Sequence, residues 1–207
     1  RAGLAAKSID RLIVSTDDPE IASIAVIAGA EVPFLRPSEY AQDTSPDQDV
    51  YYHALTTLQE KEAYKPSILV ALRPTTPLRP PTLIDAVVAR LINDPAIEIV
   101  RTFNRVDGVH HPYWMVTLDK SNSASQFMPS IDLNDYYQRQ RLPYVYRLNG
   151  LVDAIRPSLV LQDRLFDSPT LSAYETDEHV SVDIDTHLDF EFCEFLLSRK
   201  RREYDVK

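Results

Sequence analysis

Glycine is scarce in this chain of 207 residues, which has four: Gly3, Gly29, Gly108 and Gly150. Glycine-rich loops that cradle phosphate groups, such as G-x-G-x-x-G or the P-loop, need closely spaced glycines, so these four cannot build one. Any such loop is therefore absent or lies outside these residues. The chain opens with Arg1 rather than Met, which favours the second explanation.

Cysteine, long apolar runs and excess positive charge are also lacking. Cys193 is the only cysteine, which excludes an internal disulfide framework and a cysteine-based zinc site and favours a reducing cytoplasm. No apolar run approaches the ~18 residues of a membrane span, and no charged-then-apolar segment opens the chain as a secretion signal would. With 22 basic against 31 acidic residues, the net charge of −9 argues against a nucleic-acid partner.

Short apolar segments alternate with amphipathic ones along most of the chain. We expect strands at 9–15, 32–35, 67–72, 97–100 and 180–186, and helices at 19–28, 47–62, 83–91 and 186–202. Asp18 is a good N-cap for the first of these helices, and Gly29 is a plausible stop. The alternation predicts a single α/β domain over residues 1–207 with a mainly parallel sheet, in which 67–72, the most apolar run, is the central strand.

The segment 106–146 differs in character, because aromatic residues, His, Asn, Gln and Pro dominate it and its periodicity is poor. We interpret it as an inserted arm with antiparallel strands. Within it, His110 and His111 look like a metal pair, but adjacent residues of an extended chain point to opposite faces. Packing or sugar stacking by Trp114 is therefore favoured over metal binding.

The sharpest constellation is the acidic end of the segment 180–186. An extended chain alternates its faces, which puts Val180, Val182 and Ile184 on one face and Ser181, Asp183 and Asp185 on the other. Thr186 and Asp189 then form a capping box that starts the last helix. Two neighbouring carboxylates repel each other, and Mg²⁺ removes the repulsion while binding substrate phosphates. The alternative is a pair of solvated acids at a strand end.

Two further segments are rich in arginine. Arg73 and Arg79 bracket two threonines in a proline-stiffened loop after the predicted central strand, where they could form a fork for phosphate or carboxylate or simply make a rigid connection. The segment 139–150 carries three arginines, two tyrosines and an Asn-Gly turn. It is equally consistent with an anion site and with an edge strand.

Taken in order, these segments resemble the acylneuraminate cytidylyltransferase family, the CMP-sialic acid synthetases and their relatives. The matching stretches are Arg11-Leu-Ile-Val-Ser-Thr-Asp-Asp18, Ala30-Glu-Val-Pro-Phe-Leu-Arg-Pro37, Asp43-Thr44-Ser45, Arg73-Pro-Thr-Thr-Pro-Leu-Arg79, His110-His-Pro112, Arg139-Gln140 with Leu142-Pro143, Arg147-Leu-Asn-Gly150 and Ser181-Val-Asp-Ile-Asp185. Each stretch is weak alone, but eight of them in order span nearly the whole chain.

The resemblance implies a Rossmann-like nucleotidyltransferase fold that couples a nucleoside triphosphate to an acidic sugar and releases pyrophosphate. It implies that Asp183 and Asp185 hold Mg²⁺, that Arg36 lines the nucleotide pocket and that Asn149 lies near the nucleotide or sugar. Arg139 would meet the sugar carboxylate. The segment 106–146 would be a dimerisation arm that reaches into the active site of a partner, so the resemblance implies a homodimer.

The departures from the family concern the phosphate loop and the sugar pocket. The family opens with a strand and a triphosphate-binding loop that have no match here, so we expect these residues to be part of a longer chain and expect no catalysis from them alone. Sialic acid enzymes usually have Gln at Arg73, often Lys at Trp114 and commonly an aromatic residue at Asp153. These three positions are therefore expected substrate contacts of a relative that activates another nonulosonic acid or related sugar.

The sequence therefore predicts a Mg²⁺-dependent nucleotidyltransferase that activates an acidic, sialic-type sugar, with CTP as the expected nucleotide. Two alternatives stay open. One is a non-catalytic domain of the same fold that binds a nucleotide or sugar. The other is a nucleotidyltransferase that uses another base or another sugar, such as a neutral sugar phosphate.

Overall fold

The computed structural model describes residues 1–166 and 168–205, with side chains up to residue 199. The α-helices are α1 (Ala2–Ala5), α2 (Pro19–Ile27), α3 (Asp47–Glu62), α4 (Pro81–Asn93), α5 (Leu133–Tyr136), α6 (Pro157–Leu161) and α7 (His187–Asp205). Short 3-10 helices are η1 (Ser38–Tyr40), η2 (Gly108–His110), η3 (Pro112–Trp114), η4 (Arg139–Arg141) and η5 (Glu178–Val180). The strands are β1 (Leu69–Ala71), β2 (Ile99–Arg105), β3 (Val116–Leu118), β4 (Ala124–Gln126), β5 (Tyr146–Ile155) and β6 (Leu171–Glu175).

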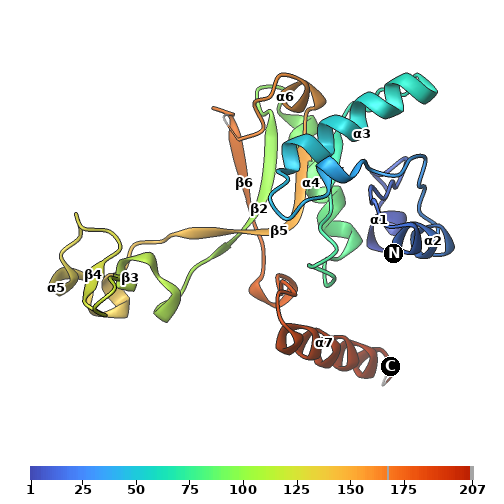
Figure 1. Cartoon of the computed structure of the whole chain (residues 1–207). Coiled ribbons are helices and arrows are strands. Elements are labelled where there is room, and N and C mark those ends of the chain that lie inside the picture. Colours follow the sequence, from blue (N-terminus) through green and yellow to red (C-terminus); the bar gives the residue numbers. More distant parts are fainter. Residues whose placement is uncertain (167, 206–207) are drawn as a thin grey trace.

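The central sheet has the strand order β1-β5-β2-β6 (Figure 1). Strand β5 is antiparallel to both of its neighbours, whereas β2 and β6 are parallel, so β1, β2 and β6 run in one direction. This is a mixed α/β fold whose strands run mainly parallel, as the sequence predicts. The helices α3 and α4 were also predicted correctly, because each carries a regular apolar stripe.

The sheet is covered on both faces. Val100 and Ala154 are paired residues on β2 and β5, and both belong to the core beneath α4. The neighbouring pair, Ile99 and Ile155, packs on the other face with Leu55 of α3 and with α6. Because side chains alternate along a strand, the pair Arg101 and Asp153, two residues away from Ile99 and Ile155, lies on the same face of the sheet as α3.

Three predicted strands differ from the structure near the N-terminal edge of the sheet. The segment 9–15 makes one isolated parallel bridge, from Ile13 to Glu31, and the described residues 32–35 form no strand. The segment 67–72 is an edge strand, β1, rather than the central one, since β5 and β2 take the middle positions. An apolar run reports burial of the faces of a strand, whereas strand order depends on which hydrogen-bonding edges meet.

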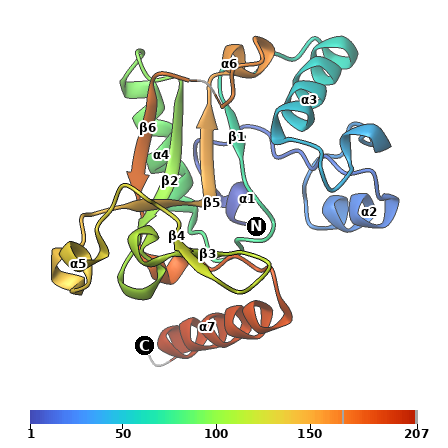
Figure 2. The ribbon, with the colours of Figure 1, turned by 60° about the vertical axis from the view of Figure 1, so that its left-hand side comes forward.

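The arm predicted at 106–146 projects from the body. Figures 1 and 2 show the chain leaving the sheet after β2 and returning along β5, with β3, β4 and α5 at the far end. Strands β3 and β4 form an antiparallel pair, as expected for this segment. The first residues of β5 pair with the last of β2, Arg105 with Tyr146, so the two strands form the stem of the arm.

Local capping signals agree with the sequence. The Asp18 carboxylate accepts hydrogen bonds from the backbone N–H groups of Glu20 (2.6 Å) and Ile21 (3.1 Å), which starts α2. Gly29 follows that helix with a φ of +95°, the left-handed backbone that a glycine stop requires. Within residues 1–166 and 168–205, no helix combines the length and the apolar character needed to cross a membrane.

Candidate active site

The loop between β1 and α4 is the scaffold of the site, and Arg79 holds it in place. The Nε of Arg79 donates a hydrogen bond to the carbonyl oxygen of Leu151 on β5 (2.6 Å). One of its terminal nitrogens reaches the carbonyl oxygen of Arg73 and the hydroxyl of Thr76, each at 2.5 Å. Burial lowers the pKa of Arg79 to about 10. Arg79 bonds to the loop itself and to β5, as a rigid connection requires, so Arg73 is the arginine of this loop that is left for a ligand.

Arg73 lies against β5 and is pinned at two points. Its aliphatic part crosses Gly150, where a Cβ atom would meet Arg73 Cδ at 2.8 Å. Its guanidinium forms an ion pair with Asp47 in the first turn of α3. Burial alone would lower the pKa of Arg73, but the nearby acids Asp47 and Asp153 and the Tyr51 hydroxyl outweigh it and raise that pKa. The side chain is 45% exposed, so it is held in place and still accessible to a ligand.

Asp153 lies beside Arg73 on the α3 face of the sheet. It pairs across the strands with Arg101, whose Nε is 3.8 Å from Asp153 Oδ2. Burial raises the pKa of Asp153, and the positive charges of Arg101 and Arg73 oppose that shift. Burial and the charge of Asp47 also raise the pKa of the Tyr51 hydroxyl. Sequence analysis missed Asp47 and Arg101, although a charged residue inside an apolar strand was a usable signal for Arg101.

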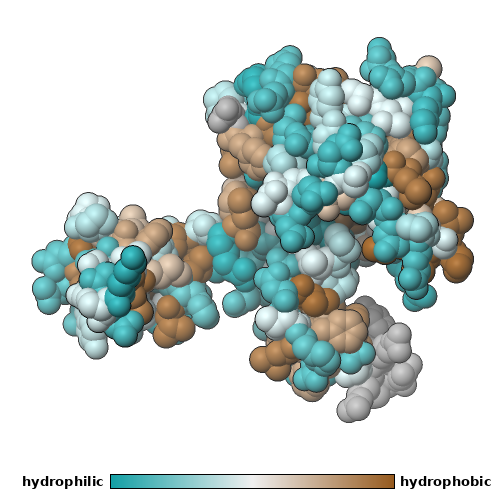
Figure 3. Space-filling view, in the orientation of Figure 1, coloured by the Kyte–Doolittle hydropathy of each residue, from teal (hydrophilic) through white to brown (hydrophobic). Residues whose placement is uncertain are grey.

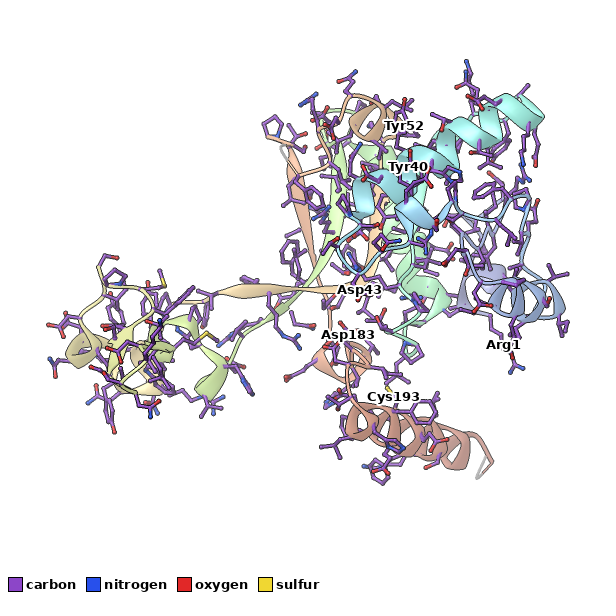
Figure 4. All side chains as sticks on the ribbon, in the orientation of Figure 1. Arg1, Tyr40, Asp43, Tyr52, Asp183 and Cys193 are labelled. Carbon is purple, nitrogen blue, oxygen red and sulfur yellow. The ribbon has the colours of Figure 1, made fainter. Side chains whose placement is uncertain are left out.

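The predicted aspartate pair lies next to the same loop. The backbone N–H of Ile184, between the two aspartates, donates to the carbonyl oxygen of Thr75 (2.8 Å). The Oδ1 atom of Asp183 is buried and has no hydrogen-bond partner within the described residues, whereas Asp185 is exposed. In Figure 4, Asp183 lies between the sheet and α7. The loop therefore brings Asp183 and Arg73 to one side of the molecule.

The predicted strand at 180–186 is wrong. The described residues 181–186 are irregular, and the backbone of Ile184 bonds to the Thr75 loop instead of to a strand. The capping box that follows is as predicted: the Asp189 carboxylate accepts from the Thr186 backbone (2.8 Å) and hydroxyl (2.7 Å), and Thr186 accepts from the Asp189 N–H (3.3 Å). These bonds lower the pKa of Asp189.

Asp183 has the features of a ligand for a hard divalent cation, and Asp185 lies two residues further along the chain. A buried carboxylate oxygen without a partner is unfavourable unless a cation or donor meets it. Over residues 1–166 and 168–205, no group of three or more His, Cys, Asp or Glu side chains is placed to hold a metal. Two carboxylates nevertheless suffice for Mg²⁺, which takes its remaining ligands from water and substrate phosphates.

Arg36 lies in a second group of polar residues, at the edge of the body. Its backbone N–H donates to the carbonyl oxygen of Thr16 (2.8 Å), which joins the two predicted N-terminal segments. Its Nε, the hydroxyl of Ser15 and the Nδ1 of His53 are all buried without a hydrogen-bond partner in the described part of the chain. Burial first, and then the charge of Arg36, lower the pKa of His53. Sequence analysis missed Ser15 and His53.

Asn149 is buried and bonded inside the protein. Its side-chain nitrogen donates to Asn104 Oδ1 (2.8 Å) and to the Thr176 hydroxyl (2.7 Å), and its oxygen accepts from the Leu151 N–H (3.2 Å). It therefore ties β5 to β2 and to the end of β6. A contact with the nucleotide or sugar stays a prediction.

Arg139 and Trp114 both lie on the arm. Trp114 donates from its indole nitrogen to the carbonyl oxygen of Tyr136 (2.8 Å), which holds η3 against α5. Arg139 lines an open, polar cleft of about 490 Å³ at the arm's base. Arg105 lines the same cleft with its guanidinium carbon 3.9 Å from the Tyr144 ring centroid, and it was missed by sequence analysis.

One chain thus divides the predicted site residues between two regions. Arg73, Asp153 and Asp183 gather around the β1–α4 loop, whereas Arg139 and Trp114 lie on the arm, which projects to the left of the body in Figure 1. The arrangement supplies acids and arginines suited to phosphate chemistry on the body and a separate arginine cleft on the arm.

Comparison with known proteins identifies the family. The cytidylyltransferase family model matches residues 1–201 of the chain. The chain belongs to the cytidylyltransferase family. This agrees with the resemblance drawn from the motifs, and it makes the protein a nucleotidyltransferase.

Relatives of this cytidylyltransferase include the CMP-N,N′-diacetyllegionaminic acid synthase of Legionella pneumophila subsp. pneumophila, which is 28% identical over 95% of this chain and 82% of its own length. The corresponding synthase of Campylobacter jejuni subsp. jejuni is 26% identical over 94% of this chain and 80% of its own length. The N-acylneuraminate cytidylyltransferase of Escherichia coli O18:K1:H7 is 28% identical over 98% of this chain, which spans 45% of that longer protein.

A solved structure has the same fold. The CMP:2-keto-3-deoxy-manno-octonic acid synthetase complexed with CTP superimposes with a TM-score of 0.69 at 14% sequence identity, over 96% of this chain and 85% of that one. At that identity the likeness establishes the fold alone.

Proposed function

We propose that this cytidylyltransferase transfers a cytidylyl group from CTP to an acidic sugar of the nonulosonic, sialic-type class and releases pyrophosphate in a Mg²⁺-dependent reaction. The observation that carries the proposal is the family match over residues 1–201, which spans both the arginine loop and the aspartate pair. The names of the relatives support the sugar class, and the CTP bound to the structural neighbour supports the nucleotide.

Asp183 and Asp185 are the residues that would hold Mg²⁺. The buried, unpartnered Oδ1 of Asp183 supports this assignment, since a carboxylate oxygen in that state gains most from a cation. Bound there, the ion would neutralise phosphate charge and favour an aligned displacement at the α-phosphorus.

The side chains of the protein would bind and orient the two substrates. Attack of a sugar hydroxyl on the α-phosphorus forms one P–O bond and breaks the bond to pyrophosphate, so alignment and charge neutralisation matter more than covalent help. Arg36, with its buried unpartnered Nε, is suited to the nucleotide. Arg73 and Asp153 would contact the sugar beside the loop.

The arm would complete the site of a partner chain. Arg139 in the cleft at the arm's base is suited to a sugar carboxylate, because a guanidinium binds carboxylates in a bidentate manner. Trp114 would contribute the sugar-stacking surface. Since the arm points away from its own body, a homodimer in which each arm serves the other body would unite the two groups of residues.

Pyrophosphate release by the intact protein, from CTP and an acidic sugar, tests the proposal. We expect the double variant Asp183→Asn with Asp185→Asn to lose at least about a hundredfold in rate at saturating Mg²⁺. The exposed pair Asp10→Asn with Asp163→Asn removes the same charge elsewhere and should keep the rate. An unchanged rate in the first variant would refute the metal assignment. CTP binding by calorimetry without any pyrophosphate release would favour the non-catalytic alternative.

A further inference from the structure

Four charged side chains form a balanced cluster on the α3 face of the sheet. We call it the charge cluster: Asp47, Arg73, Arg101 and Asp153. Asp153 is centrally placed, because it lies directly opposite Ala71 on β1 and Arg101 on β2, and Arg73 follows two residues after Ala71. Two positive and two negative groups leave the cluster with no net charge.

Arg101 and Asp153 keep hydrogen-bonding capacity that the protein does not use. Their side chains are 13% and 9% exposed, and the 3.8 Å between Nε and Oδ2 is too long for a hydrogen bond. The Nε of Arg101 is buried without a partner among the described residues. Its guanidinium carbon lies 5.5 Å from the Phe166 ring centroid, so one face is covered by an aromatic ring. Such unsatisfied buried groups usually meet a ligand or water.

Structural stability does not account for the cluster. Taking paired charges out of water costs as much as or more than their attraction returns, and apolar residues of similar volume commonly do better at such positions. The row immediately beside it on the same face, Ile99 with Ile155, is apolar and fully buried. The change from an apolar pair to an ion pair occurs where the sheet face approaches the β1–α4 loop, that is, at the substrate side.

The ligand chemistry follows from the charge balance. A neutral cluster with a buried carboxylate disfavours an anionic group, whose charge Asp153 would repel, and it offers nothing to an apolar one. It suits a neutral substituent that donates one hydrogen bond to Asp153 and accepts another from Arg101 or Arg73. An acylamino group has this pair of functions in its N–H and C=O. A hydroxyl shares it, but every sugar carries several hydroxyls, so they would give little selectivity.

We propose that Arg101 and Asp153 form a recognition pair that selects acidic sugars bearing an acylamino substituent, with Asp47 and Gly150 positioning Arg73 beside them. The inference rests on the proposed function and deepens it, because it assigns sugar specificity to a charge pair buried in the sheet. The sugar carboxylate would be bound separately, by the arginines of the arm cleft.

The test compares three acidic sugars as substrates with CTP: N,N′-diacetyllegionaminic acid, N-acetylneuraminic acid and 2-keto-3-deoxy-manno-octonic acid, the last of which has no acylamino group. We expect the protein to favour at least one acylamino sugar in kcat/KM by about a hundredfold or more, since a site built for a hydrogen-bonded group rejects a ligand that lacks it. In the apolar replacement Arg101→Met with Asp153→Leu, this ratio should fall below about tenfold, through a higher KM for the acylamino sugar.

The KM for CTP separates recognition from damage to the fold and should stay within about twofold of the wild-type value in this variant. Asp153→Asn keeps the shape of the side chain and should lower the ratio as well, which covers a failure of the double variant to fold. The matched control is Arg164→Gln. It breaks the ion pair between Arg164 and Glu98 (3.4 Å), the residue just before β2, and should leave the ratio unchanged.

The outcomes distinguish the two proposals. Release of pyrophosphate with none of the three sugars would refute the proposed function itself. Turnover without preference for an acylamino sugar, or a preference that survives in folded Asp153→Asn and in the double variant, would overturn the recognition pair and leave the proposed function intact.

Discussion

Gly150 occupies a position in which two separate constraints disfavour a side chain. Its φ is +63°, which is unfavourable for any residue with a Cβ atom, and Arg73 crosses it so closely that a Cβ would lie 2.8 Å from Cδ. Gly108 shares the first constraint, with a φ of +62°, but its Cβ would meet Arg139 only at 3.9 Å. The two glycines therefore separate backbone strain from steric conflict.

This difference yields a prediction for Gly150→Ala. We expect Gly108→Ala to lower the free energy of unfolding by about 1 kcal/mol, the cost of left-handed backbone alone, and Gly150→Ala to lower it by about 2 kcal/mol or more. Urea denaturation measures both. Gly150→Ala should also raise the KM for the sugar, because Arg73 has to move. Equal losses of stability in the two variants would show that Arg73 does not press on Gly150.

At the scale of the element, α7 depends on its N-terminal cap. The capping box of Thr186 and Asp189 closes its first turn, immediately after the segment that carries Asp183 and Asp185. Phe192 and Phe195, which helical spacing assigns to an apolar stripe, are about half exposed, at 49% and 53%. With so little of that stripe buried, the cap contributes a large share of the order in this helix.

The cap predicts a dependence of stability on pH. Hydrogen bonds from Thr186 lower the folded-state pKa of Asp189 below its ordinary value of 3.8. The carboxylate therefore contributes stability that is fully present well above pH 3.8 and is lost as the pH falls through the folded-state pKa. Asp189→Ala should lower the urea midpoint of the helical circular dichroism signal at pH 7, and the difference from wild type should shrink below pH 3.8.

The control for this prediction is Glu194→Ala, a change on the same helix away from the cap, which should leave the midpoint nearly unchanged. A difference between Asp189→Ala and wild type that stays constant from pH 7 to below pH 3 would contradict a role for the ionised carboxylate.

At the scale of the whole molecule, the arm presents apolar side chains to solvent. Val109, Tyr137 and Tyr144 are 78%, 74% and 70% exposed, and in Figure 3 the arm carries several separate brown areas among teal and white ones. Exposed apolar surface of this kind commonly marks an interface. Together with the separation of Arg139 from Asp183, it favours a dimer in which sites are shared between chains.

Mixing two inactive variants tests shared sites. If the arm acts on the partner's body, a dimer of one Arg139→Ala chain and one Asp183→Asn chain contains one intact site, formed by the Arg139→Ala body and the Asp183→Asn arm. An equal mixture allowed to exchange subunits should regain about a quarter of wild-type activity, since half of the dimers are mixed and each has one working site of two.

Light scattering of the intact protein at micromolar concentration should give twice the mass of one chain. A monomer, or a mixture that stays as inactive as its components, would refute shared sites. Mixing Arg139→Ala with Arg139→Lys chains serves as the matched control, because neither chain then supplies an intact arm and activity should not recover.

The sequence by itself determined the features that depend on near neighbours in the chain. Asp18 caps α2 and Thr186 caps α7 because a side chain reaches backbone groups two or three residues away, and α3 follows from the spacing of its own apolar residues. The family motifs, which are local strings, were equally visible.

Only the tertiary structure decided which segments meet. The alternating segment 180–186 favours a strand, yet its backbone bonds to the Thr75 loop. An extended segment joins a sheet only if a strand edge lies beside it, and the sequence does not specify that. The partnership of Arg101 with Asp153 depends on the register of β2 against β5, and that of Arg73 with Asp47 on where α3 packs. Contacts between distant residues are set by the packing of whole elements, so the paired charges became visible only once the sheet was assembled.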